Sequence, residues 1–291
     1  MTIPVASVDL RGLTRKCFTG LLLMGLFLFS GCAVRPAGAP GASEPTAKGP
    51  FTSTGTKDHI TASDEPEASQ RARVRLELAG AYFGRGQMTT ALDEVKKSIA
   101  ADPNVAAAFN LRGLIYGSLG DHRLAEESFR HALQLDPADA DSMQNFGWYL
   151  CQQSRYGEAE ALFAQALNVP QYQDSPRTLL TQGVCQARSG KLDAAERTLV
   201  RAYALEPANP AIAVNLSEVL YRRGDLERAR FYVRRVNAVP DLVSAQTLWL
   251  AVRIENKIGN GPGVADFSAQ LRNRFPESPE ANSLAEGRLN D

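Results

Sequence analysis

Residues 106–139 read AAAFNLRGLIYGSLGDHRLAEESFRHALQLDPAD, and the spacing of residues in this stretch decides the fold. Ala125 lies 34 residues after Ala91 and 34 residues before Ala159. The same spacing separates Gly113 from Gly147, Phe129 from Phe163, Ala132 from Ala166 and Pro103 from Pro137. After a shift of two residues it returns in Ala195 and Ala229. A fixed period of this length indicates a repeated supersecondary unit.

Each repeated unit is predicted to be a pair of helices. Small residues such as Gly113 and Ala125 let the two helices cross closely, and the rings of Tyr116 and Phe129 fill the remaining space. Pro137 ends the second helix. Glycines stand where the first helix of a unit must end, at Gly86, Gly120, Gly190 and Gly224.

This pattern resembles the tetratricopeptide repeat family, in which seven positions of each repeat favour small or aromatic residues or proline. In residues 106–139 these positions hold Phe109, Gly113, Tyr116, Ala125, Phe129, Ala132 and Pro137. The resemblance implies an all-α fold, a right-handed α-solenoid or superhelix of about six helix-turn-helix repeats. The predicted domain spans residues 69–291, with repeats at 72–105, 106–139, 140–175, 176–209, 210–243 and 245–278.

The last repeat is expected to be degenerate, because a terminal repeat faces solvent on one side. Trp249, Ala265 and Pro276 keep the pattern, whereas Gly261-Pro262-Gly263 is predicted to loosen the turn between its helices. Residues 280–291 are expected to cap this end of the stack.

The first 31 residues have the composition of an export signal. Arg11, Arg15 and Lys16 precede an apolar run over residues 17–29, which is shorter than the roughly 20 residues that a membrane-spanning helix needs. The stretch Leu28-Phe29-Ser30-Gly31-Cys32 resembles the lipobox of bacterial lipoproteins. This resemblance implies cleavage after residue 31 and a diacylglycerol group on the Cys32 sulfur. A plain signal peptide with an incidental cysteine is the alternative.

Residues 32–68 are predicted to be a lipidated N-terminus and a disordered tether, because proline, glycine, alanine, serine and threonine dominate them. By resemblance to enterobacterial-type lipoproteins, Ala33 in place of an aspartate favours delivery to the outer membrane, facing the periplasm. The chain has 32 basic and 32 acidic residues. Cleavage of the signal would remove three basic residues and Asp9, which leaves 29 basic and 31 acidic residues. That balance predicts no nucleic-acid partner.

Catalytic and metal-binding patterns are absent from the sequence. His59, His122 and His131 share no ligand spacing with cysteines or carboxylates, and no phosphate-binding loop appears. The charged pairs Glu126-Glu127 and Arg222-Arg223 are interpreted as solvated helix faces. We therefore expect no enzyme activity, no small-molecule substrate and no cofactor beyond the lipid on Cys32.

Two cysteines remain for the fold once Cys17 has left with the signal and Cys32 carries lipid. Cys151 and Cys185 occupy positions 12 and 10 of the first helix in successive repeats. Because these helices stack side by side and the periplasm is oxidising, a disulfide between them is predicted. The alternative is two buried free cysteines that act as small apolar residues.

Three stretches are similar to a narrower family. They are Asn145-Phe146-Gly147-Trp148-Tyr149-Leu150 with Arg155-Tyr156 and Glu158-Ala159, then residues 172–177, and residues 245–254 with 271–276. They resemble the type IV pilus biogenesis and stability lipoproteins, also called pilotins. The resemblance implies a non-enzymatic assembly factor that binds the pilus secretin, with other pilus assembly proteins as further candidates. It would promote secretin localisation and multimerisation, and hence pilus stability and twitching motility.

Two other functions stay open from the residues alone. One is a different tetratricopeptide scaffold lipoprotein of the envelope, serving β-barrel assembly or peptidoglycan enzymes. The other is an enzyme with an active site hidden in the repeats.

Partner recognition is hypothesised to occur in a groove lined by the first helix of each repeat. Trp148 and Tyr221 are the predicted anchors, because aromatic residues dominate binding hot spots; for Trp148, packing between repeats is the alternative. The residues selected by their position in the repeat are Asn110, Leu114, Gln144, Trp148, Leu180, Val184, Val214 and Tyr221.

Overall fold

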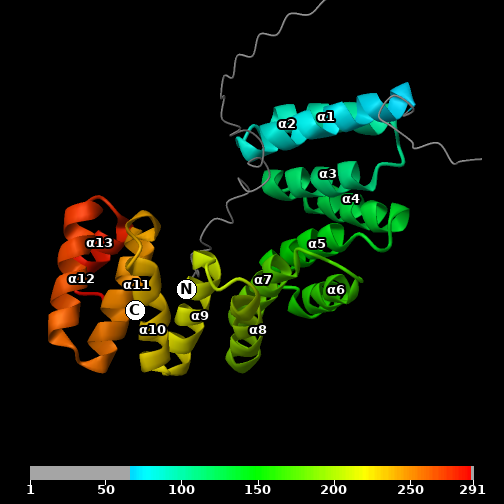
Figure 1. The fold of residues 1–291 in the computed structure, drawn as a ribbon. Helices are drawn as coiled ribbons and strands as arrows, with labels where there is room; N and C mark the ends of the chain where they lie inside the picture. The colour runs from blue at the N-terminus through cyan, green and yellow to red at the C-terminus, as the bar shows by residue number, and fades with distance from the viewer. Residues whose placement is uncertain (1–65, 290–291) are drawn as a thin grey trace, which may run out of the picture. The chain divides into compact units, whose positions relative to one another are not determined.

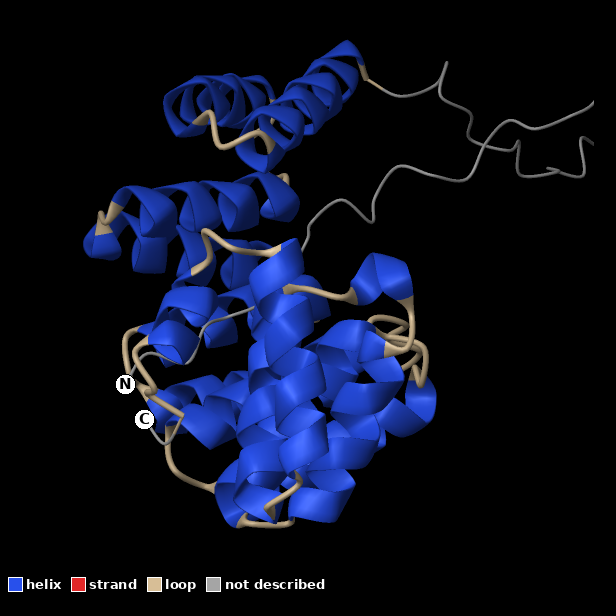
Figure 2. Cartoon of the chain, turned by 90° about the vertical axis from the view of Figure 1, so that its left-hand side faces the viewer, coloured by secondary structure: helices blue, strands red, loops and turns tan. Residues whose placement is uncertain are grey.

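The computed structural model describes residues 66–289, and the regular elements in that range are all helices (Figures 1 and 2). The predicted signal peptide, the lipidation site Cys32 and nearly all of the tether lie outside the described residues. The helices are α1 (Glu67–Gly84), α2 (Met88–Ala101), α3 (Ala106–Leu119), α4 (His122–Leu135), α5 (Ala140–Gln152), α6 (Tyr156–Asn168), α7 (Ser175–Arg188), α8 (Leu192–Leu205), α9 (Pro210–Arg223), α10 (Leu226–Asn237), the 3₁₀ turn η2 (Pro240–Leu242), α11 (Ala245–Ile258), α12 (Gly261–Arg274) and α13 (Pro279–Ala285).

Successive helices pack in pairs, and the pairs stack in chain order. Each odd-numbered helix from α1 to α11 packs mainly against the even-numbered helix that follows it (Figure 1). Between residues 66 and 289, six such pairs give six repeats, and the predicted all-α stack of helix pairs is confirmed.

Small residues set the close crossing of the two helices in a pair. A Cβ atom added to Gly113 of α3 would lie 2.8 Å from the ring of Phe129 in α4. A Cβ added to Gly183 of α7 would lie 2.6 Å from Cγ of Leu199 in α8. Phe129 and Leu199 are fully buried, so the helices could not keep this separation with a larger residue at either position.

The turn inside each pair uses a left-handed residue. Gly86, Gly120, Gly190 and Gly224 have φ between 75° and 83°, as their placement at the end of a first helix predicted. The third repeat has Ser154 at the equivalent position, with φ of 60°. The Cβ atom of this serine is strained in the left-handed conformation, whereas a glycine adopts it without strain.

The first helix begins earlier than the sequence analysis placed it. α1 starts at Glu67, so Glu67 and Ala68 belong to the helix and not to the tether. The negative charge of Glu67 in the first turn interacts favourably with the helix dipole, and Glu67 forms an ion pair with Arg71 one turn later. The hydroxyl of Ser69 also donates to Asp102 at the end of α2, at 3.0 Å.

The prediction of a loosened turn in the sixth repeat was wrong. Gly259, with φ of 80°, makes the turn, and Gly261 already begins α12. Pro262 is tolerated because the first turn of a helix needs no amide donor there. Gly263 leaves room for the buried carboxylate of Glu255, whose Oε2 would lie 2.9 Å from an added Cβ.

The C-terminal end of the stack is covered by α13, which packs against α11 and α12. Its Ala281 is buried, and Leu284 packs against the same core. Between residues 66 and 289, no helix combines the length and apolar character that a membrane span requires.

Candidate protein-binding face

The first helices of neighbouring repeats contact one another and form a continuous layer. α3 packs against α5, α5 against α7, and α7 against α9. We call the accessible side of these four helices the first-helix face. It is the face on which the sequence analysis placed partner recognition.

A disulfide fixes the middle of this layer. Cys151 of α5 and Cys185 of α7 are bonded, with their Cα atoms 5.9 Å apart. Both residues are buried, within a core cluster that also holds Phe146 and Phe163. The covalent link restricts how far α5 and α7 can shift against each other.

Side-chain amides and hydroxyls bridge successive first helices. The Asn145 amide donates to Asn110 Oδ1 at 3.3 Å, and the Gln144 amide donates to Thr181 Oγ1 at 3.4 Å. The Gln144 Oε1 atom is buried without a hydrogen-bond partner in residues 66–289. Because this oxygen is buried, Gln144 acts in the packing between α5 and α7.

The eight residues predicted to line the groove differ in accessibility. Leu114, Trp148 and Val214 are half-buried and reach the surface. The other five are buried and act mainly in packing: Asn110, Gln144, Leu180, Val184 and Tyr221.

Trp148 lies at the junction between two core clusters. It packs against the cluster around Phe129 and Phe163 and against the larger cluster of α7 to α12. The Arg188 guanidinium lies 5.8 Å from its ring centroid. Trp148 therefore joins repeats and still offers part of its indole to a partner.

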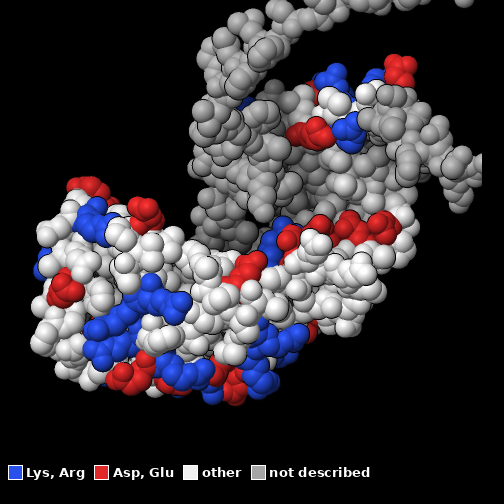
Figure 3. All heavy atoms as spheres, in the orientation of Figure 1, with Lys and Arg blue, Asp and Glu red and all other residues white. Residues whose placement is uncertain are grey.

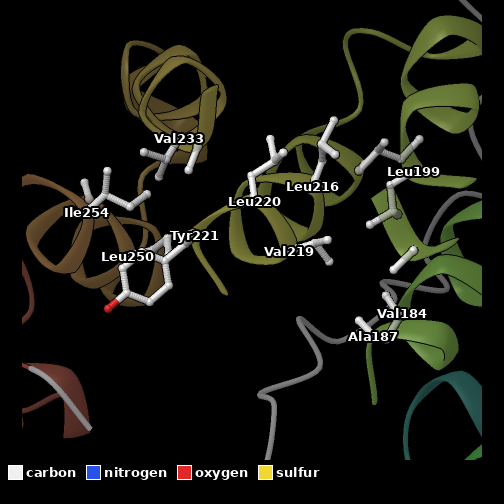
Figure 4. Close-up of a cluster of buried hydrophobic side chains, with 14 of the residues drawn as sticks. Val184, Ala187, Leu199, Leu216, Val219, Leu220, Tyr221, Val233, Leu250 and Ile254 are labelled. Carbon is white, nitrogen blue, oxygen red and sulfur yellow. The ribbon is translucent and has the colours of Figure 1, made fainter. Parts of the chain in front are cut away.

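Tyr221 is not the exposed anchor that the sequence suggested, because only 4% of it is accessible. The Arg253 guanidinium lies 4.6 Å from its ring centroid, and the Lys257 amine lies 4.5 Å from it. Figure 4 shows the ring beside Leu250, where it packs between α9 and α11. A partner could reach this ring only by displacing the two cations.

A shallow cleft lies between α7 and α9, with Leu199 of α8 also in its lining. Val184 and Ala187 of α7 lie opposite Val219 of α9 (Figure 4). Asn215, Glu218 and Arg222 supply polar groups to the same cleft. The position of Val184 in its repeat predicted a place on this face. Nothing in the sequence distinguishes Asn215, Glu218 and Arg222, because single polar or charged residues on helices are usually solvated.

The carboxylate of Glu218, which lines this cleft, has a shifted pKa. Burial raises the pKa of Glu218, although the nearby Arg253, Arg222 and Lys257 oppose the increase. The Arg253 guanidinium lies 3.8 Å from the Glu218 carboxylate. The cleft thus has an apolar floor with Glu218 and Arg222 at its edge, and the space within it is about that of one water molecule.

The two-residue insertion of the third repeat is held to the first-helix layer. The Tyr172 hydroxyl contacts Thr178 at 3.0 Å and donates to Asp141 at 3.3 Å. Arg177 donates to the same Asp141 at 2.6 Å. The insertion therefore forms a defined part of the surface near the start of α5 and α7.

The interpretation of the charged pairs as purely solvated faces was incomplete. Glu126 of α4 accepts from Arg155 of the next repeat, and Arg223 pairs with Asp193 at 2.8 Å and with Glu196. These ion pairs connect neighbouring repeats. The spacing of charges along one helix could not reveal them.

The histidines contact aromatic side chains. His122 Nδ1 lies 3.1 Å from the Tyr149 hydroxyl, and the His131 ring centroid lies 4.2 Å from that of Phe109. In the described part of the chain, no group of three histidines, cysteines or carboxylates is arranged to hold a metal ion.

Comparison with known proteins places these features in a family. The tetratricopeptide repeat family matches residues 105–171 and 186–241. The type IV pilus assembly protein PilF of Pseudomonas aeruginosa is 25% identical over 205 residues, which is 70% of this chain and 81% of PilF.

Two solved structures extend the likeness to the whole repeat stack. A structure of Pseudomonas aeruginosa PilF, 23% identical, covers 76% of this chain and 100% of its own, with a TM-score of 0.64. The crystal structure of PilW, described as a widely conserved type IV pilus biogenesis factor, is 31% identical. It covers 74% of this chain and 99% of its own, with a TM-score of 0.69. The chain is thus a tetratricopeptide repeat protein that belongs to the family of type IV pilus assembly factors represented by PilF and PilW.

Proposed function

We propose that this protein is a non-enzymatic lipoprotein of the outer membrane that binds the type IV pilus secretin at the periplasmic face. It promotes localisation and multimerisation of the secretin, and thereby supports pilus biogenesis, stability and twitching motility. The match to PilW carries the proposal, because it extends over 99% of that pilus biogenesis factor and not over a generic pair of repeats. The choice of the secretin as partner rests on the resemblance of the Asn145–Leu150 stretch to the pilotins.

The sequence around Cys32 supports the membrane anchor. The lipobox ends in Cys32, and acyl chains contribute about 0.8 kcal/mol for each buried methylene, so more than one chain holds a protein firmly. Ala33 favours the outer membrane. The function needs no cofactor other than this lipid.

The first-helix face supports the binding mechanism. Trp148 offers an aromatic surface, and the cleft of Val184, Val219 and Glu218 offers an apolar floor with a polar edge. The disulfide between α5 and α7 restricts the movement of Trp148 relative to Val184. A preformed surface loses less conformational entropy on binding than one that must first become ordered.

Affinity capture of the secretin from an envelope extract tests this mechanism. The bait is the mature chain from residue 32 with Cys32→Ser, so that lipid does not contribute. Trp148→Ala should lower capture roughly tenfold or more if the indole is a hot spot. Phe231→Ala is the matched control, because it removes an aromatic ring from a second helix.

Two results of this capture would contradict the proposal. If no form of the protein retains the secretin, the proposed partner is wrong. If a folded Trp148→Ala variant captures the secretin as well as the unaltered chain does, Trp148 belongs only to the packing between repeats.

A further inference from the structure

The outward side of α8 and α10 exposes apolar side chains. Phe231 has 57% of its surface accessible, and it is the one aromatic residue among the exposed large hydrophobic residues of the described chain. Four of the seven residues in that set lie on or just after these two helices: Val200, Leu205, Phe231 and Val239. Single exposed apolar residues are ordinary on a protein surface, so these side chains point to a ligand only together with the charges beside them.

Arginines without an acidic partner surround these apolar side chains. Arg197 and Arg201 lie next to Val200 on the surface of α8, and Arg235 lies one turn after Phe231 on α10. These three arginines form no ion pair or hydrogen bond within residues 66–289. Their charges are therefore available to an external anion.

Two contacts place these side chains on one surface. Arg228 of α10 donates to Glu196 of α8 at 2.6 Å, and the rings of Tyr203 and Tyr232 meet edge to face with centroids 5.0 Å apart. The side chains of the two helices therefore meet at these two points. We call the surface formed by Arg197, Val200, Arg201, Phe231 and Arg235 the α8–α10 face.

The charge of the second helices changes along the solenoid. α8, α10 and α12 contain eight arginines (two, four and two) and four acidic residues. α2, α4 and α6 contain four basic and six acidic residues. Figure 3 shows Lys and Arg atoms gathered over the part of the surface formed by α8 to α12. The second helices of the C-terminal repeats thus carry a net positive charge.

We propose that the α8–α10 face binds an anionic phospholipid surface. The arginines would contact headgroup phosphates, and the Phe231 ring would enter the boundary between headgroups and acyl chains. A lipid surface is favoured over an acidic protein segment because exposed apolar side chains, Val200 and Phe231, protrude beside unpaired arginines, the combination that enters a layer of anionic headgroups. The inference rests on the proposed lipid anchor only for bringing this face near a membrane.

Co-sedimentation with vesicles tests the inference. The mature chain from residue 32 with Cys32→Ser is mixed with phosphatidylethanolamine vesicles that contain or lack phosphatidylglycerol. We expect binding to the anionic vesicles that weakens as salt is added. Because each arginine near an anionic surface contributes about fivefold in partitioning, Arg235→Glu should reduce binding at least fivefold. Phe231→Ala should also reduce it.

Matched controls come from the other half of the stack. Lys96→Glu reverses an exposed charge on α2, and Leu119→Ala truncates a leucine that is 46% exposed at the end of α3. Both should bind vesicles like the unaltered chain. All four positions are exposed, so circular dichroism should show an unchanged fold for every variant.

Equal binding to both kinds of vesicle, or an equal loss in the controls, would overturn the inference. So would Phe231→Ala and Arg235→Glu variants that bind vesicles normally but no longer capture the secretin, because the face would then belong to a protein partner. The vesicle assay contains neither the secretin nor the lipid anchor. Its failure is therefore distinct from failure of the proposed pilus function.

Discussion

Replacing Gly113 by alanine should destabilise the repeat stack, although alanine is the better helix former by about 1 kcal/mol. The added Cβ would lie 2.8 Å from two carbons of the Phe129 ring. That ring is fully buried and stacked on Phe146, with centroids 5.2 Å apart, so it cannot turn away. We therefore take the cost of overpacking as about 3 kcal/mol, the upper end of the usual range. The net loss in free energy of unfolding is then about 2 kcal/mol.

A double-mutant cycle isolates the contact behind this loss. Phe129→Ala should cost about 3–5 kcal/mol by itself. In that background, Gly113→Ala should become stabilising by about 1 kcal/mol, because the clash is gone and the helix propensity remains. The coupling energy between the two positions is then about 3 kcal/mol.

Urea unfolding followed by circular dichroism measures these differences through the midpoint, with the slope m checked for each variant. Gly80 of α1 is the matched control, since no atom lies within 4 Å of an added Cβ there. Gly80→Ala should stabilise by about 1 kcal/mol. If Gly113→Ala raises the midpoint as much as Gly80→Ala does, the close crossing of α3 and α4 does not require glycine and the reasoning fails.

Three further predictions concern single features of the fold. Glu255 is buried and accepts hydrogen bonds from Arg230, Arg234 and Asn260. Burial alone would raise the pKa of Glu255, but these bonds outweigh it and hold the pKa below 4.5. Glu255→Gln should cost about 2 kcal/mol at pH 7, less than a fully buried pair because both arginines reach water. The difference in stability between this variant and the unaltered chain should disappear as the pH falls from 4.5 through the lower folded-state pKa of Glu255. If the denaturation midpoints of the two proteins differ equally at all pH values, the prediction is wrong. Ser154→Gly should raise the free energy of unfolding by up to about 1 kcal/mol, because glycine adopts a positive φ without strain. Gly120→Ser should lower the free energy of unfolding for the same reason. Reducing the disulfide should add two hydrogen atoms to the intact mass, and replacing both cysteines by serine should cost about 3–4 kcal/mol for a loop of this size; an unchanged mass on reduction would show free thiols.

The sequence predicts the repeat stack well because its signals are local and periodic. Gly113, Ala125 and Phe129 recur at fixed spacing, since every crossing of two helices repeats the same geometric demand. The glycine turns at Gly120 and Gly224 follow for the same reason. Ser154 stands 34 residues after Gly120, at the same turn position, but serine has no preference for the left-handed conformation, so the residue type does not reveal it.

The candidate binding face was less predictable. Position within a repeat shows which way a residue points, but it does not show what lies above it. Tyr221 occupies a groove position, yet Arg253 and Lys257 from the following repeat cover its ring. The role of Glu255 depends on Arg230, Asn260 and Gly263, which meet only when the last two repeats pack together. The same holds for the ion pairs between repeats.

The most direct test of the proposed role is the amount of multimeric secretin in the outer membrane of a host strain that lacks this gene. We expect the multimers to be lost, while other β-barrel proteins of the outer membrane assemble normally. The unaltered gene should restore the multimers, and the Cys32→Ser form should restore them poorly. Normal secretin multimers in the deletion strain, or a general defect in β-barrel assembly, would contradict the proposal of a dedicated pilus assembly factor.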